Sequence, residues 1–239
     1  KHLIKNSART IIITHLGRPE GKVVDGLKLI AVARALEKLL KKRVHKLNGA
    51  VGPAVESKLK KLKDGEVALL ENIRFYPQEE KCEPKFTKQL ARLGDIYVND
   101  AFAACHRKHA SVYGVARILP SYAGLLVEEE IKNLSPLLHN KKRPMTLIVG
   151  GAKIDTKIGL IKSFFGKADY ILIGGALANT FIAAQGFDIG KSLYEPEKIK
   201  IAQEILMLAE KKGQKLLLPE DVIVADIITH YAATAYLPL

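Results

Sequence analysis

Cysteine is scarce and tryptophan is absent in this chain of 239 residues. Only Cys82 and Cys105 are present, far apart and without histidines at the spacing of metal ligands. This pattern argues against a disulfide framework and against a zinc site, so we expect no protein-bound metal. It favours a reducing, cytoplasmic setting.

Long apolar runs are missing as well. None approaches the roughly 20 residues that a helix needs to cross a bilayer. The first residues, Lys1–Ser7, lack the apolar core of a signal peptide. We therefore expect a soluble protein with no membrane partner. The sequence starts without Met and ends at Leu239 soon after a predicted strand, which suggests that a longer protein is only partly represented.

Standard nucleotide motifs are not found either. Gly186–Ser192 is similar to a phosphate-binding P-loop, but three residues separate its glycines where that motif needs four, and the segment before it is typical of a helix. The glycine pairs at 150–151 and 174–175 lack the G-x-G-x-x-G spacing. We interpret Gly186–Ser192 as a turn that ends a helix.

Acidic residues are outnumbered by basic ones, 25 Asp and Glu against 38 Lys and Arg, which gives a formal charge of +13. Such a balance favours anionic partners, and it leaves nucleic acid, acidic membrane and phosphorylated metabolite open. Many lysines fall in helical repeats such as Lys58–Lys63, where a solvated face is the simplest interpretation.

Strand and helix patterns alternate along the chain and predict an α/β fold of two doubly wound, Rossmann-like domains with parallel sheets. The expected strands are 10–14, 44–47, 66–73, 95–100, 146–149, 170–175 and 215–218. The expected helices are 27–42, 52–62, 84–93, 125–139, 153–165, 176–185 and 196–212. We place the domains at 1–124 and 143–239, joined by a helix and linker at 125–142. Few strands are evident in the second domain, so we expect it to be incomplete.

One corner is suited to phosphate. A buried strand is expected to end at Gly150 and Gly151 and to lead into a helix that carries Lys153 and Lys157 about one turn apart on one face. Glycines allow another group to approach the backbone, and a helix N-terminus offers free N–H groups. The alternative is a plain strand–turn–helix with two solvated lysines.

Cationic side chains follow three of the expected strands. They are His15 with Arg18, Arg74, and His106 with Arg107. Because the carboxyl ends of parallel strands meet at one edge of a sheet, we expect these side chains to gather there and to require an anion. Taken singly, each arginine could be a surface residue and each histidine a structural one.

Taken together, the motifs resemble those of the phosphoglycerate kinase family along nearly the whole chain and in order. The segments that carry the resemblance are His15–Gly21, Leu69–Phe75, Tyr97–Phe102 with His106 and Arg107, Gly150–Lys157, Ile173–Ala178 and Leu218–Asp221. The resemblance implies reversible phosphoryl transfer between 1,3-bisphosphoglycerate and ADP, giving 3-phosphoglycerate and ATP, by a monomer that closes about the helix at 125–139.

The resemblance also implies site residues and cofactors. Those expected to bind 3-phosphoglycerate are His15, Leu16, Gly17, Arg18, Arg74, His106 and Arg107. Those expected to bind ATP or ADP are Gly150, Gly151, Ala152, Lys153, Lys157 and Gly175, with Lys153 and Lys157 also catalytic. Mg²⁺ is expected to be bound mainly through the nucleotide.

The chain also departs from the family pattern. The family has an Asp-x-Asn strand and a catalytic arginine upstream of His15, and an acidic ribose contact and a Gly-Gly-Asp turn beyond Asp221, which this sequence lacks. Ala176 and Leu177 replace a common Gly-Met, and residues 227–239 match nothing that we can assign. We therefore expect little activity from this stretch alone. The alternatives are a non-catalytic 3-phosphoglycerate-binding homologue and, less favoured, a basic nucleic-acid-binding module.

Overall fold

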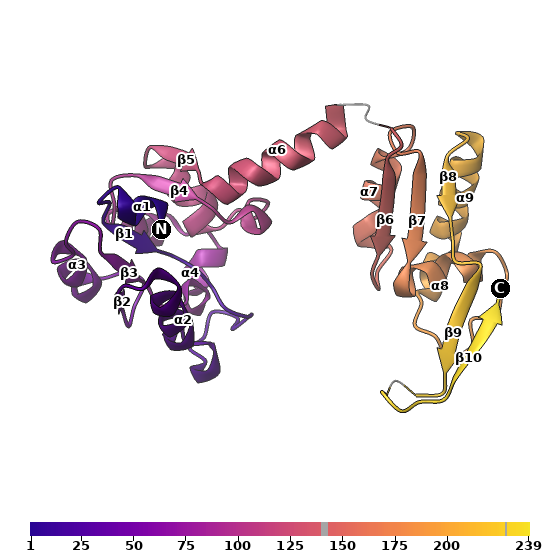
Figure 1. The fold of residues 1–239 in the computed structure, drawn as a ribbon, viewed down its shortest axis with the longest axis horizontal. Helices are drawn as coiled ribbons and strands as arrows, with labels where there is room; N and C mark the ends of the chain where they lie inside the picture. Colours follow the sequence, from indigo (N-terminus) through magenta and orange to yellow (C-terminus); the bar gives the residue numbers. More distant parts are fainter. Residues whose placement is uncertain (140–142, 228) are drawn as a thin grey trace. The chain divides into compact units, whose positions relative to one another are not determined.

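The computed structural model describes residues 1–139, 143–227 and 229–239 (Figure 1). The chain divides into two compact units, Lys1–Asn133 and Leu134–Leu239, and the dividing position lies inside helix α6 (Leu125–His139). This helix has the bounds that the sequence predicts. The domain ends at 124 and 143 stay a prediction, and residues 140–142 of the expected linker lie outside the described residues.

Parallel strands form the framework of the first unit. Strands β1 (Thr10–Ile12), β3 (Val67–Leu69) and β2 (Val44–Lys46) pair in that order, with β1 and β2 flanking β3. A second parallel pair consists of β4 (Tyr97–Asn99) and β5 (Ser121–Ala123). Since β3 is buried along its whole length, its apolar residues hold the centre of the unit.

Helices and short turns connect these strands. The α-helices of the unit before α6 are α1 (His2–Lys5), α2 (Ile30–Leu40), α3 (Pro53–Lys60), α4 (Pro77–Glu80) and α5 (Pro84–Ala91). Short 3₁₀ or π turns are η1 (Asp25–Leu27), η2 (Ile73–Phe75), η3 (Phe102–Ala104), η4 (Ala110–Gly114) and η5 (Val115–Arg117). Proline begins α3, α4 and α5, where its missing N–H costs no helical hydrogen bond.

The second unit has its own parallel sheet and its own core. Strands β6 (Thr146–Gly150), β7 (Tyr170–Gly174) and β8 (Lys215–Leu217) pair in that order. Helices α7 (Asp155–Ser163), α8 (Gly175–Ala184) and α9 (Ile199–Lys211), with the turn η6 (Pro196–Lys198), complete its α/β part. The core includes Ile154, Ile171, Leu177, Phe181 and Ile205, all fully buried.

The α/β class with parallel sheets is confirmed, and several elements differ from the prediction. Strand β5 was missed because Ser-Tyr-Ala is short and lacks a β-branched run. The antiparallel hairpin of β9 (Asp221–Ala225) and β10 (Thr234–Pro238) was also missed, because β10 has no alternating apolar pattern. In the described residues, no strand pairing joins the β1–β3–β2 sheet to the β4–β5 pair.

Within residues 1–139, 143–227 and 229–239, no helix combines the length and the apolarity that crossing a bilayer requires.

Burial of Phe181 leads to a prediction about stability. Its side chain is 0% exposed, whereas Phe187 on the loop after α8 is 47% exposed. We expect Phe181→Ala to lower the free energy of unfolding of the second unit by about 3–5 kcal/mol, because it leaves a cavity. Urea unfolding should show a much smaller loss for the control, Phe187→Ala. Equal losses in the two variants would contradict a packed core around Phe181.

Candidate functional site

The loop that follows β1 carries the first group of expected site residues. His15, Leu16, Gly17 and Arg18 are all exposed there. Gly17 has a φ of +65°, and a Cβ at this position would lie 2.8 Å from Cδ2 of Leu27. Both the backbone angle and the lack of space require glycine. The path of the loop is therefore set by its packing against Leu27.

Arg74 joins this loop to the turn after β3. It belongs to η2, and its Nη1 donates a hydrogen bond to the carbonyl oxygen of Gly17 at 3.0 Å. Its Nε lies 3.7 Å from Oε1 of Glu80. Arg74 is only 8% exposed. Its guanidinium has five N–H donors, so these contacts leave others for a ligand.

The loop after β4 carries the third group. His106 is exposed there, and Arg107 and His109 are half-buried. Nδ1 of His109 lies 3.8 Å from Oε1 of Glu79, and Glu79 accepts hydrogen bonds from the backbone N–H and the hydroxyl of Ser111, at 2.9 and 2.5 Å. Glu79, on α4, therefore holds this loop in place. Burial raises the pKa of Glu79, against the lowering effect of the bonds from Ser111.

The cationic side chains that follow β1, β3 and β4 interact electrostatically. Burial lowers the pKa of His15, and the positive charges of Arg74, Arg107 and His109 lower it further. The pKa of His109 is also lowered, first by burial and then by Arg107, Arg74 and His106, while Glu80 opposes the shift. The cations that follow β1, β3 and β4 are thus close enough to repel one another. The structure brings together His15, Arg74, His106, Arg107 and His109, and Arg18 lies exposed on the same loop as His15.

The second unit contains the glycine–lysine corner. Gly150 ends β6 opposite Gly174, and Gly151 has a φ of +144°. The carbonyl oxygen of Gly151 accepts a hydrogen bond from the N–H of Leu177 at 2.7 Å. A Cβ at Gly175 would lie 3.3 Å from the nitrogen of Gly151, so the start of α8 approaches the corner closely. Glycines at 151 and 175 permit this approach.

The two lysines of the corner differ from the prediction. Because α7 begins at Asp155, Lys153 precedes the helix and shares no helix face with Lys157. Ala152 and Lys153 are exposed, and Lys157 is half-buried beside Gly151. The N–H of Ile154, which the prediction left free for phosphate, donates to Oε2 of Glu195 at 2.5 Å. That carboxylate therefore occupies the N–H of Ile154, and the cationic side chains of the corner are Lys153 and Lys157.

Sequence reasoning missed three buried polar residues that support the first site. They are Glu71, Asn72 and Glu79, which are 8%, 0% and 1% exposed. The sequence offered one signal for such residues, the polar pair Glu71 and Asn72 directly after the apolar run of β3. Polar groups are rarely buried without hydrogen-bond partners, so a polar pair at a buried position is expected to bond to neighbouring segments.

The position of His15 leads to a prediction about its titration. We expect Arg107→Ala to raise the pKa of His15 toward its ordinary value of 6.5, because one of the nearby positive charges is removed. NMR titration of the imidazole checks this, with Arg34→Ala, an exposed arginine on α2, as control. An unchanged pKa in Arg107→Ala would contradict the cation cluster.

Comparisons with known proteins address the family. A family model described as "Phosphoglycerate kinase" matches residues 1–236, which include most of the segment 227–239 that the motifs leave unassigned. The chain is 52% identical over 226 residues to a phosphoglycerate kinase of Moorella thermoacetica, covering 95% of this chain and 58% of the relative. It is 49% identical over 224 residues to one of Pelotomaculum thermopropionicum, covering 94% and 57%.

Solved structures agree with the family model. Phosphoglycerate kinase from Pyrococcus horikoshii matches with a TM-score of 0.86 at 34% identity, over 99% of this chain and 60% of that one. The enzyme from Coxiella burnetii matches with a TM-score of 0.78 at 40% identity, over 98% and 59%. The chain thus spans under two thirds of the length of these relatives, and it belongs to the phosphoglycerate kinase family.

Proposed function

We propose that the protein acts as a phosphoglycerate kinase, which transfers a phosphoryl group between 1,3-bisphosphoglycerate and ADP and yields 3-phosphoglycerate and ATP. The observation that carries the proposal is the cluster of His15, Arg74 and Arg107: burial lowers the pKa of His15, and repulsion from the two arginines lowers it further. An anionic ligand would relieve this repulsion. Guanidinium groups bind phosphate and carboxylate, the two anionic groups of 3-phosphoglycerate, through charge-assisted hydrogen bonds.

The other half of the proposal concerns the nucleotide. Gly150, Gly151 and Gly175 provide backbone that a nucleotide can approach closely, and Ala152 adds no bulk. Lys153 and Lys157 supply positive charge beside it. Phosphoryl transfer depends mainly on positioning and charge stabilisation, and lysine ammonium groups provide both. In this proposal Lys153 binds nucleotide phosphate, and Lys157 stabilises the charge on the transferring group.

Mg²⁺ enters the proposal as a partner of the nucleotide. Among the residues that the structure describes, no three His, Cys, Asp or Glu side chains are grouped as ligands for a metal ion. The donor set of the corner consists of lysines and backbone groups, which suits nucleotide phosphates better than a bare cation. Bound to those phosphates, the ion would neutralise part of their charge.

The proposal also includes the acceptor class and the setting. The acceptor in the ATP-consuming direction is the carboxylate of 3-phosphoglycerate. Cytoplasmic location, a monomeric state, the absence of a nucleic-acid partner, and the division at residues 124 and 143 are retained as proposals.

Removal of Arg107 tests the substrate site. We expect Arg107→Ala to weaken binding of 3-phosphoglycerate about 10- to 100-fold, because charge-assisted hydrogen bonds contribute about 1.5–3 kcal/mol. Calorimetry should show nearly unchanged affinity for the control, Arg34→Ala. Equal binding by Arg107→Ala and the unaltered chain would contradict the assigned site, and absence of binding by the unaltered chain would contradict the proposed substrate.

A second candidate is a homologue that binds 3-phosphoglycerate without catalysis. The match covers 58% of the length of the Moorella relative, so residues 1–239 are tested by themselves. For these residues by themselves we expect binding of 3-phosphoglycerate but little turnover in a coupled assay. Turnover at the rate of a full-length phosphoglycerate kinase would contradict that expectation. Salt-sensitive binding to a polynucleotide, without metabolite binding, would favour the nucleic-acid alternative.

A further inference from the structure

Asn72 lies at the junction of the segments that build the cation cluster. Its side chain is 0% exposed. Its Nδ2 donates to the carbonyl oxygens of Leu16 and Leu27, at 2.8 and 3.0 Å, and its Oδ1 accepts from the N–H of Arg74 at 3.1 Å. One side chain therefore connects the loop after β1, the turn before α2 and the turn that carries Arg74.

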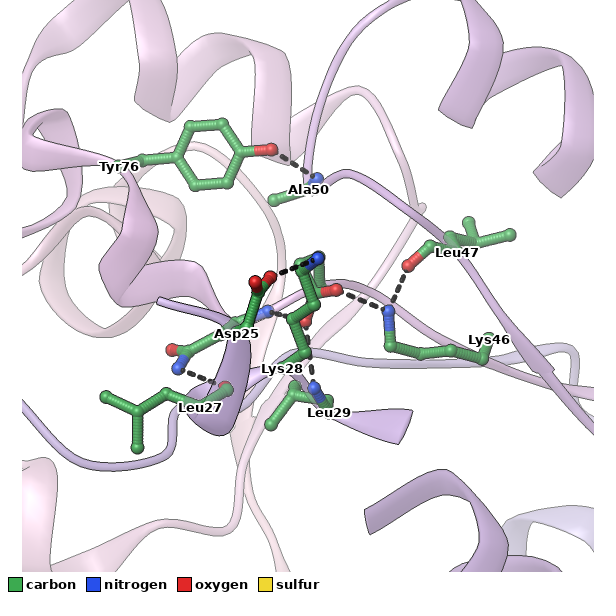
Figure 2. A network of polar contacts seen from close by, with 10 residues as sticks. Asp25, Leu27, Lys28, Leu29, Lys46, Leu47, Ala50 and Tyr76 are labelled. Carbon is green, nitrogen blue, oxygen red and sulfur yellow. Dashed lines mark hydrogen bonds and ion pairs between the residues drawn. The ribbon is translucent and has the colours of Figure 1, made fainter. Parts of the chain in front are cut away.

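Glu71 holds Asn72 in turn. Its Oε1 accepts hydrogen bonds from the N–H groups of Asn72 and Leu29, at 2.8 and 3.0 Å. Its Oε2 accepts from Nζ of Lys46 at 2.8 Å, and Lys46 also donates to the carbonyl oxygen of Leu47 (Figure 2). Burial alone would raise the pKa of Glu71, but the bonds from Lys46 and the two N–H groups outweigh it and lower the pKa. The carboxylate thus stays ionised and fixes the backbone on both sides.

We infer that Asn72, supported by Glu71, is a positioning residue for the anion site: its amide holds the His15–Arg18 loop in register with Arg74. The inference rests on the proposed function, since the positioned groups are those assigned to 3-phosphoglycerate. All three bonds of the side chain end on segments that border or carry the cluster, and none contributes to strand pairing.

Two hydrogen bonds to backbone carbonyl oxygens hold the loop after β1. Leu16 accepts from Asn72, and the next residue, Gly17, accepts from Arg74. Without the amide of Asn72, the carbonyl oxygens of Leu16 and Leu27 lose their donor, and the loop must move to find another. If the loop moves, the distance between His15 and Arg74 changes. The carbonyl oxygen of Gly17 then no longer fixes the orientation of the Arg74 guanidinium.

Substitution of Asn72 by serine separates two roles of its side chain. One is donation to the carbonyl oxygens of Leu16 and Leu27, and the other is acceptance from the N–H of Arg74. Asn72→Ser retains an oxygen able to accept from the N–H of Arg74, because serine and asparagine cap helix starts equally well. Its hydroxyl is too short to reach both carbonyl oxygens. Serine is smaller than asparagine and leaves empty space. Asn72→Thr fills more of that space, so both variants are measured.

A matched control comes from the same region. Tyr76→Phe removes the hydroxyl that accepts from the N–H of Ala50 at 3.0 Å, a bond that does not involve the loop (Figure 2). Circular dichroism establishes that each variant is folded, and all measurements are made well below its melting temperature.

The first readout is the NMR titration of His15, which needs no substrate. The charged or titratable groups that act on it are Arg74, Arg107, His109 and Glu80. In Asn72→Ser and Asn72→Thr we expect the pKa of His15 to move toward 6.5, because the loop no longer holds the imidazole beside the arginines. In Tyr76→Phe it should stay at the value of the unaltered chain.

The second readout is calorimetric affinity for 3-phosphoglycerate. We expect about a tenfold loss or more in both Asn72 variants, and no loss in Tyr76→Phe. Folded Asn72 variants with an unchanged titration and an unchanged affinity would overturn the inference, and so would loss of the fold in both. If the unaltered chain fails to bind 3-phosphoglycerate, the proposed function fails, and the titration alone decides the role of Asn72.

Discussion

The hydrogen bond from Arg74 to the carbonyl of Gly17 is the contact on which the first candidate site depends. It joins two loops that are far apart in the sequence, and it places a buried positive charge beside His15. A buried arginine is costly unless its donors are satisfied, so the backbone oxygen of Gly17 and the carboxylate of Glu80 stabilise the guanidinium. Its remaining donors and those of Arg107 are the groups to which we assign anion binding.

The glycine–lysine corner follows a different principle. Its shape comes from close backbone approach, with Gly151 and Gly175 in conformations that side chains rarely adopt. Glu195 accepts from the N–H of Ile154, the residue before α7, and Lys153 and Lys157 are the cationic side chains of the corner. The two candidate sites therefore differ in their cations: the first contains the buried Arg74, and the second has the exposed Lys153 and the half-buried Lys157.

Much of the fold could be predicted from the sequence, because apolar periodicity decides strand and helix where burial is strong. β7 ends one residue before its expected bound, and α9 begins three residues later and ends one residue earlier than expected. Weakly patterned elements such as β5 and β10 could not be predicted, because pairing with another segment, and not local composition, creates them. The cations could be predicted from their positions after strands. The roles of Asn72 and Glu71 could not be predicted, because these roles depend on which backbone groups the fold brings within hydrogen-bond distance.

We propose that the cations after β1, β3 and β4 form one site for an anion that bears phosphate and carboxylate. A crystal structure of this chain with 3-phosphoglycerate is the decisive measurement. We expect the ligand to contact Arg107 and to lie beside His15 and Arg74, with the hydrogen bond from Arg74 to Gly17 preserved. Ligand bound only at the glycine–lysine corner, or only on exposed lysines elsewhere, would contradict it.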